Sequence, residues 1–254
     1  MTENKKAYYK ISTLEKGLQV IELLAKNKTL SVTEVAKHLD QNRSASHRFL
    51  ATLHELGYVL KDSQSRYRLS LKLFEIANHI DDVDEVRSMT RPFMRELSTT
   101  HRETVNLGRL EGSDVVTIDT VLGPEVIKFD SRIGERSPAH TLAMGKAILA
   151  FRSKEEQTTY AENARFSRLT PKTIATKTAF KKELEAIRNQ GFAMDEEEWC
   201  LGLRCVAIPL FNDTEPSYAL SVSGPTSRMT PEKVSALQSE LLMVSRALSQ
   251  KFNR

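Results

Sequence analysis

One short stretch, DEEEWCLGLRC at residues 195–205, holds four consecutive acidic residues, the only tryptophan and both cysteines of the chain. Carboxylates and thiols are side chains that bind metal ions, transfer protons or attack electrophiles. Cys200 and Cys205 lack the second ligand pair that a structural zinc site needs, and neither has an identifiable base that would activate it as a nucleophile. The stretch is therefore interpreted as a solvated acidic loop or as part of a site that senses a ligand.

The rest of the chain carries no familiar catalytic signature. It has no G-x-G-x-x-G, phosphate-loop, G-x-S-x-G or H-E-x-x-H motif. The histidines are scattered, at positions 38, 47, 54, 79, 101 and 140. We therefore predict a protein that is not an enzyme, without catalytic residues, metal ligands or a cofactor.

Composition places the chain among soluble globular proteins, with 40% hydrophobic and 28% charged residues in 254 positions. No uncharged run approaches the roughly 20 apolar residues that a membrane-spanning helix requires. The first residues, MTENKKAYYK, lack the apolar core of a signal peptide. Two cysteines form no disulfide framework, so we expect a cytoplasmic protein without a membrane partner.

Positive charge is concentrated at the N-terminal end. Residues 1–72 hold 13 Lys/Arg and 7 Asp/Glu, whereas the whole chain has a net charge of +4. The remainder is therefore slightly acidic. This distribution favours a polyanion as the partner of the first segment, although ordinary variation of surface charge gives the same pattern.

Three short helices are predicted within the first 60 residues. A capping box of Ser12 and Glu15 opens the first, and a second spans 31–39. A third spans 43–56, capped by Asn42 or Ser44 and ended by a glycine at position 57. The expected buried residues of the first and third helices are Leu14, Leu18, Ile21, Ala25, Ala45, Phe49, Leu53 and Leu56.

The second and third helices, separated by about three turn residues, indicate a helix-turn-helix. The third helix begins with small or polar residues, so its N-terminus can approach a major groove closely. Hydroxyl groups and terminal N–H groups there hold phosphate, and arginine reads a guanine edge. The DNA-binding residues predicted on this helix are Arg43, Ser44, Ala45, His47 and Arg48.

A basic hairpin follows the helices. Strands at 58–60 and 66–69 flank a turn at 62–65, and their alternation predicts that Lys61, Arg66 and Arg68 face backbone phosphates. Three helices and a two-stranded wing make a winged helix-turn-helix. We therefore predict a DNA-binding domain over residues 1–70.

A linker helix over residues 71–91 is predicted next. Leu69, Leu73, Ile76 and Ile80 have near-heptad spacing, and Pro92 permits only a helix start or a kink. We expect 12–16 helical residues whose apolar stripe packs on the wing or on a second chain.

Residues 92–254 mix strands and helices without strict βαβ alternation, so the fold class predicted is α+β. Strands are expected at 104–110, 115–121, 125–130, 206–210 and 218–223. Helices are expected from Phe93, over 138–151 and 180–190, and from Pro231 to about Lys251.

Several motifs in this order resemble the IclR family of transcriptional regulators over nearly the whole chain. They are SASHRFLATLHELGYV, YRLSLKLFEIA, RETVNLGRLEGSDVVTID, RIGERSP with AMGKAILAF, DEEEWCLGLRCVAIPLF and ALSVSGPTSRMT. The resemblance is greatest to members that sense small 2-oxo acids or sugar acids. It implies a GAF-like effector-binding domain at 92–254, and homodimers or homotetramers on a palindromic double-stranded DNA operator.

The resemblance also implies a cavity for a small carboxylate effector. The matching positions are Phe129, Ala143, Met144, Asp195, Leu203, Cys205, Ser221 and Ser223. The residue types suit such a ligand. The start of the 138–151 helix offers N–H groups, alternating serines place two hydroxyls on one strand face, and Asp195 accepts a hydrogen bond from a ligand hydroxyl.

The chain departs from the family in the turn of the helix-turn-helix, where Asp40 and Gln41 replace a glycine and an apolar residue. Aspartate tolerates the left-handed conformation, so the turn is expected to survive. The overall prediction is a repressor controlled by a small organic acid. The alternatives are a regulator of aromatic acids, an enzyme, and a ligand-free oligomerisation domain, the last two fused to a DNA-binding head.

Overall fold

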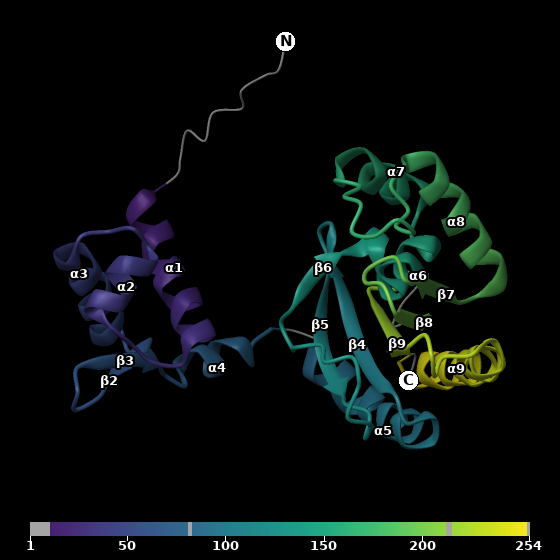
Figure 1. The fold of residues 1–254 in the computed structure, drawn as a ribbon, viewed down its shortest axis with the longest axis horizontal. Helices are drawn as coiled ribbons and strands as arrows, with labels where there is room; N and C mark the ends of the chain where they lie inside the picture. Colours follow the sequence, from purple (N-terminus) through teal and green to yellow (C-terminus); the bar gives the residue numbers. More distant parts are fainter. Residues whose placement is uncertain (1–10, 81–82, 212–214, 253–254) are drawn as a thin grey trace, which may run out of the picture. The chain divides into compact units, whose positions relative to one another are not determined.

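The computed structural model describes residues 11–80, 83–211 and 215–252 (Figure 1). The chain divides into two compact units, Met1–Asp81 and Asp82–Arg254. The second unit begins within the segment 71–91 that the sequence predicts as a linker, and the helix that contains Pro92 belongs wholly to the second unit.

The smaller unit contains four helices and a three-stranded sheet in the order β1-β3-β2 among its described residues. Its elements are α1 (Ser12–Asn27), β1 (Leu30–Ser31), α2 (Val32–His38), α3 (Arg43–Glu55), β2 (Val59–Lys61), β3 (Arg66–Leu69) and α4 (Lys72–Ala77). Helices α1–α3 and the β2–β3 hairpin form the predicted winged helix-turn-helix.

Two caps define where α2 and α3 begin. The Ser31 hydroxyl accepts from the backbone N–H of Glu34 at 3.3 Å, while the Glu34 carboxylate accepts from Ser31, which completes a capping box. Asn42 caps α3 by accepting from the N–H of Ala45 at 2.7 Å. The box predicted at Ser12 is wrong, because α1 begins at Ser12 itself and its N-cap is Ile11.

The predicted apolar faces of α1 and α3 contribute only in part to the core of this unit. Val20, Leu24 and Leu50 are fully or almost fully buried, whereas Leu14 and Leu18 are 59% and 52% exposed. On α3, the predicted residues Phe49 and Leu53 are partly buried and pack against the core. Helix α1 therefore carries a second apolar stripe that stays at the surface.

The two residues that depart from the family pattern in the turn between α2 and α3, Asp40 and Gln41, each have a structural consequence. Asp40 adopts the left-handed conformation with φ 47°, as expected for a residue that replaces glycine. Gln41 turns inward, and both polar atoms of its side chain are buried without a hydrogen-bond partner in the described part of the chain. An unsatisfied buried amide is destabilising, so Gln41 is a strained replacement for an apolar residue.

The expected linker helix of 12–16 residues is wrong. Helix α4 is six residues long, residues 81 and 82 lie outside the described residues, and α5 (Val83–His101) continues through Pro92. Of the near-heptad residues, only Leu73 and Ile76 lie on α4, while Leu69 ends β3 and Ile80 follows the helix.

The larger unit is built on a six-stranded antiparallel sheet in the order β6-β5-β4-β9-β8-β7. Its strands are β4 (Thr104–Glu111), β5 (Asp114–Val121), β6 (Arg136–Pro138), β7 (Ala193–Glu196), β8 (Leu203–Leu210) and β9 (Tyr218–Pro225). Its other elements are α5, η1 (Ala139–Thr141), α6 (Ala143–Phe151), α7 (Lys154–Asn163), α8 (Lys177–Gln190) and α9 (Pro231–Phe252).

Helices cover both faces of this sheet (Figure 1). One face packs against α6 and α8 through Ala207, Ala219 and Cys205, while the other packs against α5 and α9 through Val206, Ile208 and Val222. Successive strand residues point to opposite faces, and helices cover both faces. The sequences of β8 and β9 are therefore mostly apolar along their whole length and do not alternate between polar and apolar. The unit is α+β, as the sequence predicted.

The predicted elements of this unit need four corrections. Residues 125–130 form an irregular segment and not a strand, and the sequence missed β6, β7 and α7. Strands β6 and β7 are short, and both lie at sheet edges, where fewer hydrophobic neighbours mark them. In the described ranges, no helix combines the length and hydropathy needed to cross a bilayer.

Candidate functional site

The four acids that open DEEEWCLGLRC have four different environments, and they do not form one solvated run. Asp195 lies in β7 and is fully buried. Its Oδ1 accepts hydrogen bonds from the backbone N–H groups of Glu198 at 2.6 Å and Trp199 at 3.4 Å. This carboxylate therefore fixes the turn that follows the strand, in the manner of an Asx turn.

The next two acids pair at the surface of the turn. Glu196 binds Arg204 across the β7–β8 ladder, in which these residues are direct partners. Glu197 binds Lys172 and accepts from the N–H of Gly202 at 2.8 Å. Glu197 and Gly202 have φ of 61° and 82°, which closes the tight turn between the strands.

The fourth acid, Glu198, enters the interior and binds Lys146 of α6, whose side chain is fully buried. Glu183 of α8 lies 3.6 Å from the same ammonium group. The Thr173 hydroxyl donates to the carbonyl of Glu198 at 2.6 Å, which holds the backbone of the turn. The sequence pattern missed Lys146 and Glu198, although a lysine within the apolar run AMGKAILAF is itself a signal that a counter-charge is buried nearby.

The predicted polar effector residues form a row across the sheet. Asp195 pairs with Cys205, Cys205 pairs with Ser223, and Ser223 pairs with Thr104. Ser221 lies two positions from Ser223, so its side chain points to the same face. Both serines are 2% exposed, and Asn106 donates to the Ser223 hydroxyl at 3.3 Å.

The predicted apolar residues pack around that row. Their common cluster contains Phe129, Ala143, Met144, Leu203 and Cys205. A Cβ on Gly108 would lie 2.9 Å from the Met144 sulfur, so Met144 packs directly on the backbone of β4. The Trp199 ring stands edge-on to Phe129, with centroids 5.4 Å apart, and adds a wall that the sequence prediction left out.

The start of α6 reaches this face of the sheet through close packing. A Cβ on Gly145 would approach the carbonyl oxygen of Ala139 to 2.1 Å, so only glycine lets α6 pack against η1. The glycine therefore brings the N-terminus of α6, with Ala143 and Met144, onto the strands.

Burial changes the acid–base properties of the row. Desolvation, opposed by the Glu198 N–H and reinforced by the Glu198 charge, raises the pKa of Asp195 to about 7. Asp195 Oδ2 is buried and has no hydrogen-bond partner within the described residues. Burial and the nearby Asp195 also raise the pKa of the Cys205 thiol, so Cys205 is a neutral wall residue and a poor nucleophile.

In the smaller unit, α3 presents a polar surface near its start. Arg43, Ser44, His47 and Arg48 are exposed, while Ala45 is half-buried. Ala45 and Arg48 line an apolar groove between α1, α3 and α4, so the outward face of the helix is carried by the other three predicted residues. Ala45 therefore stands at the edge of the predicted reading surface.

The three basic residues of the wing, predicted to face backbone phosphates, lie on both sides of the hairpin. Lys61 pairs with the buried Tyr67 in the ladder and lies 5.8 Å from its ring, whereas Arg66 and Arg68 point to the other side. Arg66 donates to the carbonyl of Thr29 at 3.0 Å and lies 3.2 Å from Glu34. Arg66 thus ties the wing to α2, which leaves Arg68 and Lys61 as the exposed basic groups of the hairpin.

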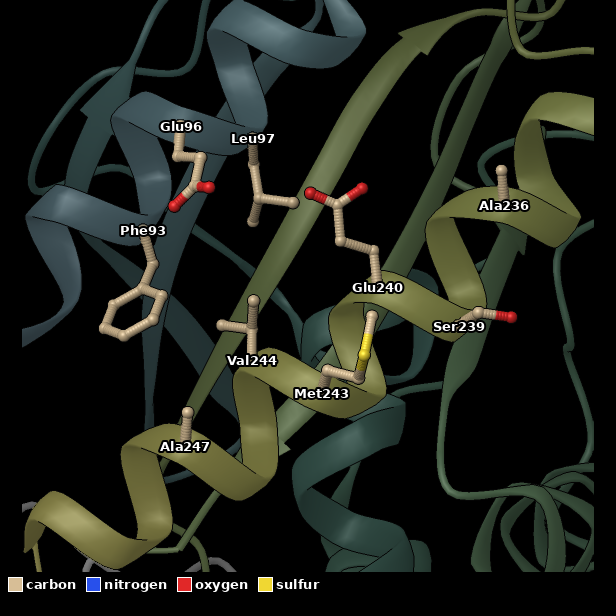
Figure 2. A pocket seen from close by; sticks show the side chains of 9 residues that line it. All are labelled: Phe93, Glu96, Leu97, Ala236, Ser239, Glu240, Met243, Val244 and Ala247. Carbon is tan, nitrogen blue, oxygen red and sulfur yellow. The ribbon is translucent and has the colours of Figure 1, made fainter.

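A second groove lies on the opposite face of the larger unit, between α5 and α9 (Figure 2). It encloses about 550 Å³, and Figure 2 shows Phe93 and Leu97 facing Val244 and Met243. Because α5 and α9 cover the far side of the sheet, this groove is separate from the Asp195 row.

A winged helix followed by a separate α+β unit is typical of a DNA-binding regulator. Comparison with known families agrees with this class. The description "Bacterial transcriptional regulator IclR C-terminal" matches residues 79–250, and "IclR helix-turn-helix domain" matches residues 13–63. The chain belongs to the IclR family of transcriptional regulators, which are not enzymes.

Individual relatives agree with the family assignment. The HTH-type transcriptional regulator KdgR of Escherichia coli K12 is 34% identical over 242 residues, which are 94% of this chain and 92% of the relative. The IclR crystal structure from Thermotoga maritima matches with a TM-score of 0.81 at 29% identity and covers 96% of this chain and 100% of that one.

A more distant structure shows the fold alone. It is an IclR homologue from Microbacterium hydrocarbonoxydans, described as complexed with 4-hydroxybenzoate, with a TM-score of 0.79 at 19% identity. The match covers 93% of this chain and 98% of that one.

Proposed function

We propose that this protein is a repressor that binds an operator through its winged helices, and that a small organic acid bound beside the Asp195 row controls its affinity for DNA. The observation that carries the ligand site is Asp195 Oδ2, a buried polar atom without a partner in the described part of the chain. Buried polar atoms are normally satisfied, so this orphan calls for an explanation, and its place beside the Ser221 and Ser223 hydroxyls on one strand face favours a ligand as the partner.

The surrounding chemistry suits a small carboxylate. The Ser221 and Ser223 hydroxyls offer donors from β9, and the start of α6 offers N–H groups and the positive end of a helix dipole. Phe129, Met144 and Leu203 supply apolar walls. The effector class is a 2-oxo acid or a sugar acid, and an aromatic acid is the second candidate, because the fold neighbour from Microbacterium is described with 4-hydroxybenzoate.

On the DNA side, Arg43, Ser44 and His47 are the base-reading candidates, because they are exposed on the outward face of α3. Arg48 is a further base-reading candidate, although it also lines the apolar groove between α1, α3 and α4. Lys61 and Arg68 would contact phosphates from the wing. Occupation of an operator excludes other proteins from the same DNA, which is the simplest route to repression.

The apolar groove of the smaller unit is the proposed surface for a second copy. It measures about 1020 Å³, and its apolar lining combines residues of α1 and α3 that the sequence predicts to be buried with two residues of the predicted linker stripe. Those lining residues are Leu14, Leu18, Ile21, Ala45, Phe49, Leu53, Leu56, Leu73 and Ile76. Sequence patterning selects these positions because they are periodic and apolar, and exposed apolar patches of this kind mark interfaces. A homodimer would present two reading helices to the two halves of an operator.

Ligand control follows if the effector binds one arrangement of the dimer more tightly than another. A differential affinity of that kind shifts operator binding by about 1–3 kcal/mol in typical regulators. The same coupling makes operator DNA change the affinity for the effector by an equal factor.

A thermal-shift screen tests the ligand site. Purified protein is heated with glyoxylate, pyruvate, 2-keto-3-deoxygluconate, other sugar acids and 4-hydroxybenzoate, and a bound ligand raises the melting temperature. The double variant Ser221→Ala/Ser223→Ala should lose the shift, while Ser239→Ala, an exposed hydroxyl on α9, should keep it.

Operator binding is then measured by fluorescence anisotropy on DNA selected by the protein from a random library. The active acid should change the dissociation constant for wild-type protein and leave the double serine variant unaffected. A response that survives in the double variant contradicts the site. Silence across the whole panel favours a C-terminal unit that holds the dimer together without a ligand.

A further inference from the structure

Three ionisable groups are buried together at the end of the Asp195 row. Lys146 from α6 is fully buried, Asp195 from β7 is fully buried, and Glu198 is 6% exposed. Lys146 binds Glu198, and Glu183 from α8 approaches the same ammonium group at 3.6 Å. Cys205 from β8 lies next to Asp195, and Ser223 from β9 completes the row.

The charges of this cluster do not balance if every group is ionised. Lys146 then faces two buried carboxylates, with a third, Glu183, partly exposed at its edge. A carboxylate ligand beside the row would add another negative charge within a few ångströms of Asp195. Like charges in a site closed to water disfavour ionisation strongly, as in carboxylate pairs that share one proton.

The hydrogen bonds show which carboxyl takes the proton. Lys146 is engaged by Glu198 and Glu183, and its charge favours the ionised form of Glu198, against burial, which raises the pKa of Glu198. Asp195 Oδ1 already accepts two backbone N–H groups, whereas Oδ2 has no hydrogen-bond partner among the described residues. Glu198 Oε2 is also buried without a partner among those residues, so the ion pair of Glu198 with Lys146 is what distinguishes the two carboxyl groups. A proton placed on Oδ2 therefore leaves the turn intact and gives the orphan atom a donor function.

We infer that Asp195 serves the effector site as a neutral carboxylic acid whose Oδ2–H donates a hydrogen bond to the carboxylate of the ligand. This inference rests on the proposed effector site and reverses the acceptor role that the sequence suggests for Asp195. The raised pKa of Asp195, about 7 and caused mainly by desolvation, agrees with a proton held at neutral pH. Before the ligand binds, the charges of Lys146 and Glu198 then cancel and Asp195 is neutral. The remaining negative charge is that of Glu183, which is partly exposed to solvent.

Two consequences distinguish a donor from an acceptor. The ligand must present an anionic or carbonyl acceptor to Asp195, and its affinity must fall as the pH rises above about 7, where Asp195 loses the proton. Asparagine reproduces the neutral acid, because its carbonyl oxygen accepts as Oδ1 does while its NH₂ group donates in place of Oδ2–H. A ligand hydroxyl that donates to an ionised Asp195 can also turn and accept from the amide of asparagine, so the loss of pH dependence in Asp195→Asn, and not retained binding by itself, identifies the donor role.

The first experiment needs no ligand. The free energy of unfolding is measured by urea denaturation from pH 4 to pH 8 for wild type, Asp195→Asn and Asp130→Asn, the last neutralising an exposed acid of the same size. An acid whose pKa is raised in the folded state binds more protons when folded, so wild-type stability falls as the pH rises from about 4 to about 7. One such group changes the folding equilibrium constant by about tenfold per pH unit in that window.

Asp195→Asn should remove this component, and Asp130→Asn should retain it. Identical pH profiles for wild type and Asp195→Asn overturn the inference whatever the ligand is.

The second experiment measures dissociation constants for glyoxylate, pyruvate, 2-keto-3-deoxygluconate and 4-hydroxybenzoate by calorimetry at pH 6.5 and pH 8.5, in buffers of different ionisation enthalpy. We expect wild type to bind more weakly at pH 8.5 and to take up close to one proton with the ligand there, but only a small fraction of a proton at pH 6.5, where Asp195 already holds most of it. Asp195→Asn should bind with little pH dependence, and Asp195→Ala should bind weakly at both values.

Loss of binding in Asp195→Asn, with an unchanged fold, shows an acceptor and overturns the inference while the effector site stands. If Asp195 proves protonated but none of the four acids binds, the proposed function fails for carboxylates, and the donor role toward a ligand fails with it.

Discussion

Lys146 and Glu198 lie 52 positions apart in the sequence and meet as a buried ion pair between α6 and the turn after β7. The pair joins the two parts of the proposed effector site that come from different regions of the chain. Because α6 carries Ala143 and Met144 while the turn carries Trp199, loss of the pair would loosen both walls.

Lys146→Met tests the energetic role of this pair. The variant leaves Glu198 buried without its counter-charge, and breaking a buried pair in this way costs about 3–5 kcal/mol of unfolding free energy. The double variant Lys146→Met/Glu198→Leu should recover most of that loss, since it removes both desolvated charges. Urea denaturation measures all of these variants, with Lys172→Met as a surface control that removes the partner of Glu197 and should change little. Equal losses in the single and double variants would show that the charges do not interact.

The large features of the fold could be predicted because they depend on local signals. Asn42 before α3, the glycine at position 191 after α8 and the Thr230-Pro231 start of α9 mark helix ends through their own hydrogen bonds and dihedral angles. Strands β6 and β7 lack such signals, since each depends on a neighbouring strand that lies elsewhere in the sequence. Residues 125–130 have strand-like composition but no paired neighbour in the sheet.

The candidate site could be predicted in part. The resemblance supplied Asp195, Ser221 and Ser223, and the strand register places them on one face. The residues that periodicity misses are those whose role depends on a distant partner, as with Glu198 and Lys146, or Arg66 and Glu34. A charge written in the sequence looks the same whether it meets solvent or a counter-charge, so only the fold separates the two cases.

Gln41→Leu should stabilise the smaller unit. The buried amide of Gln41 has no partner in the described ranges, and its replacement removes an unsatisfied polar group, which is worth about 1–3 kcal/mol. Gln64→Leu, at an exposed position of the wing turn, is the matched control and should leave the melting temperature nearly unchanged. If Gln41→Leu instead lowers operator affinity without raising stability, the amide is retained for DNA contact.

The two wing arginines should behave differently when each is replaced by alanine. Arg68→Ala should weaken DNA binding on all sequences and reduce the slope of log K against log salt by about 1, without a change in melting temperature. Arg66→Ala should lower the melting temperature, because it removes the contacts with Thr29 and Glu34 that tie the wing to α2. Anisotropy at several salt concentrations and a thermal melt separate these outcomes. The same salt slope for both variants, with unchanged melting, would place Arg66 on the DNA.

Leu18→Glu tests the groove of the smaller unit as the dimer surface. Leu18 is 52% exposed in the single chain and lines the groove, so a glutamate there should be tolerated by the fold but not by an apolar interface. We expect sedimentation to show a smaller assembly, and operator affinity to fall by about 100-fold or more, because linked binding of two half-sites is lost.

Leu169→Glu makes the same chemical change at a position 47% exposed in the larger unit, and it should alter neither property. The circular dichroism melt of both variants should stay close to wild type at protein concentrations below the dimer dissociation constant, where the interface adds no stability. An unchanged assembly in Leu18→Glu would leave the groove as a surface for some other partner and would require the reading helices to be paired through the larger unit alone.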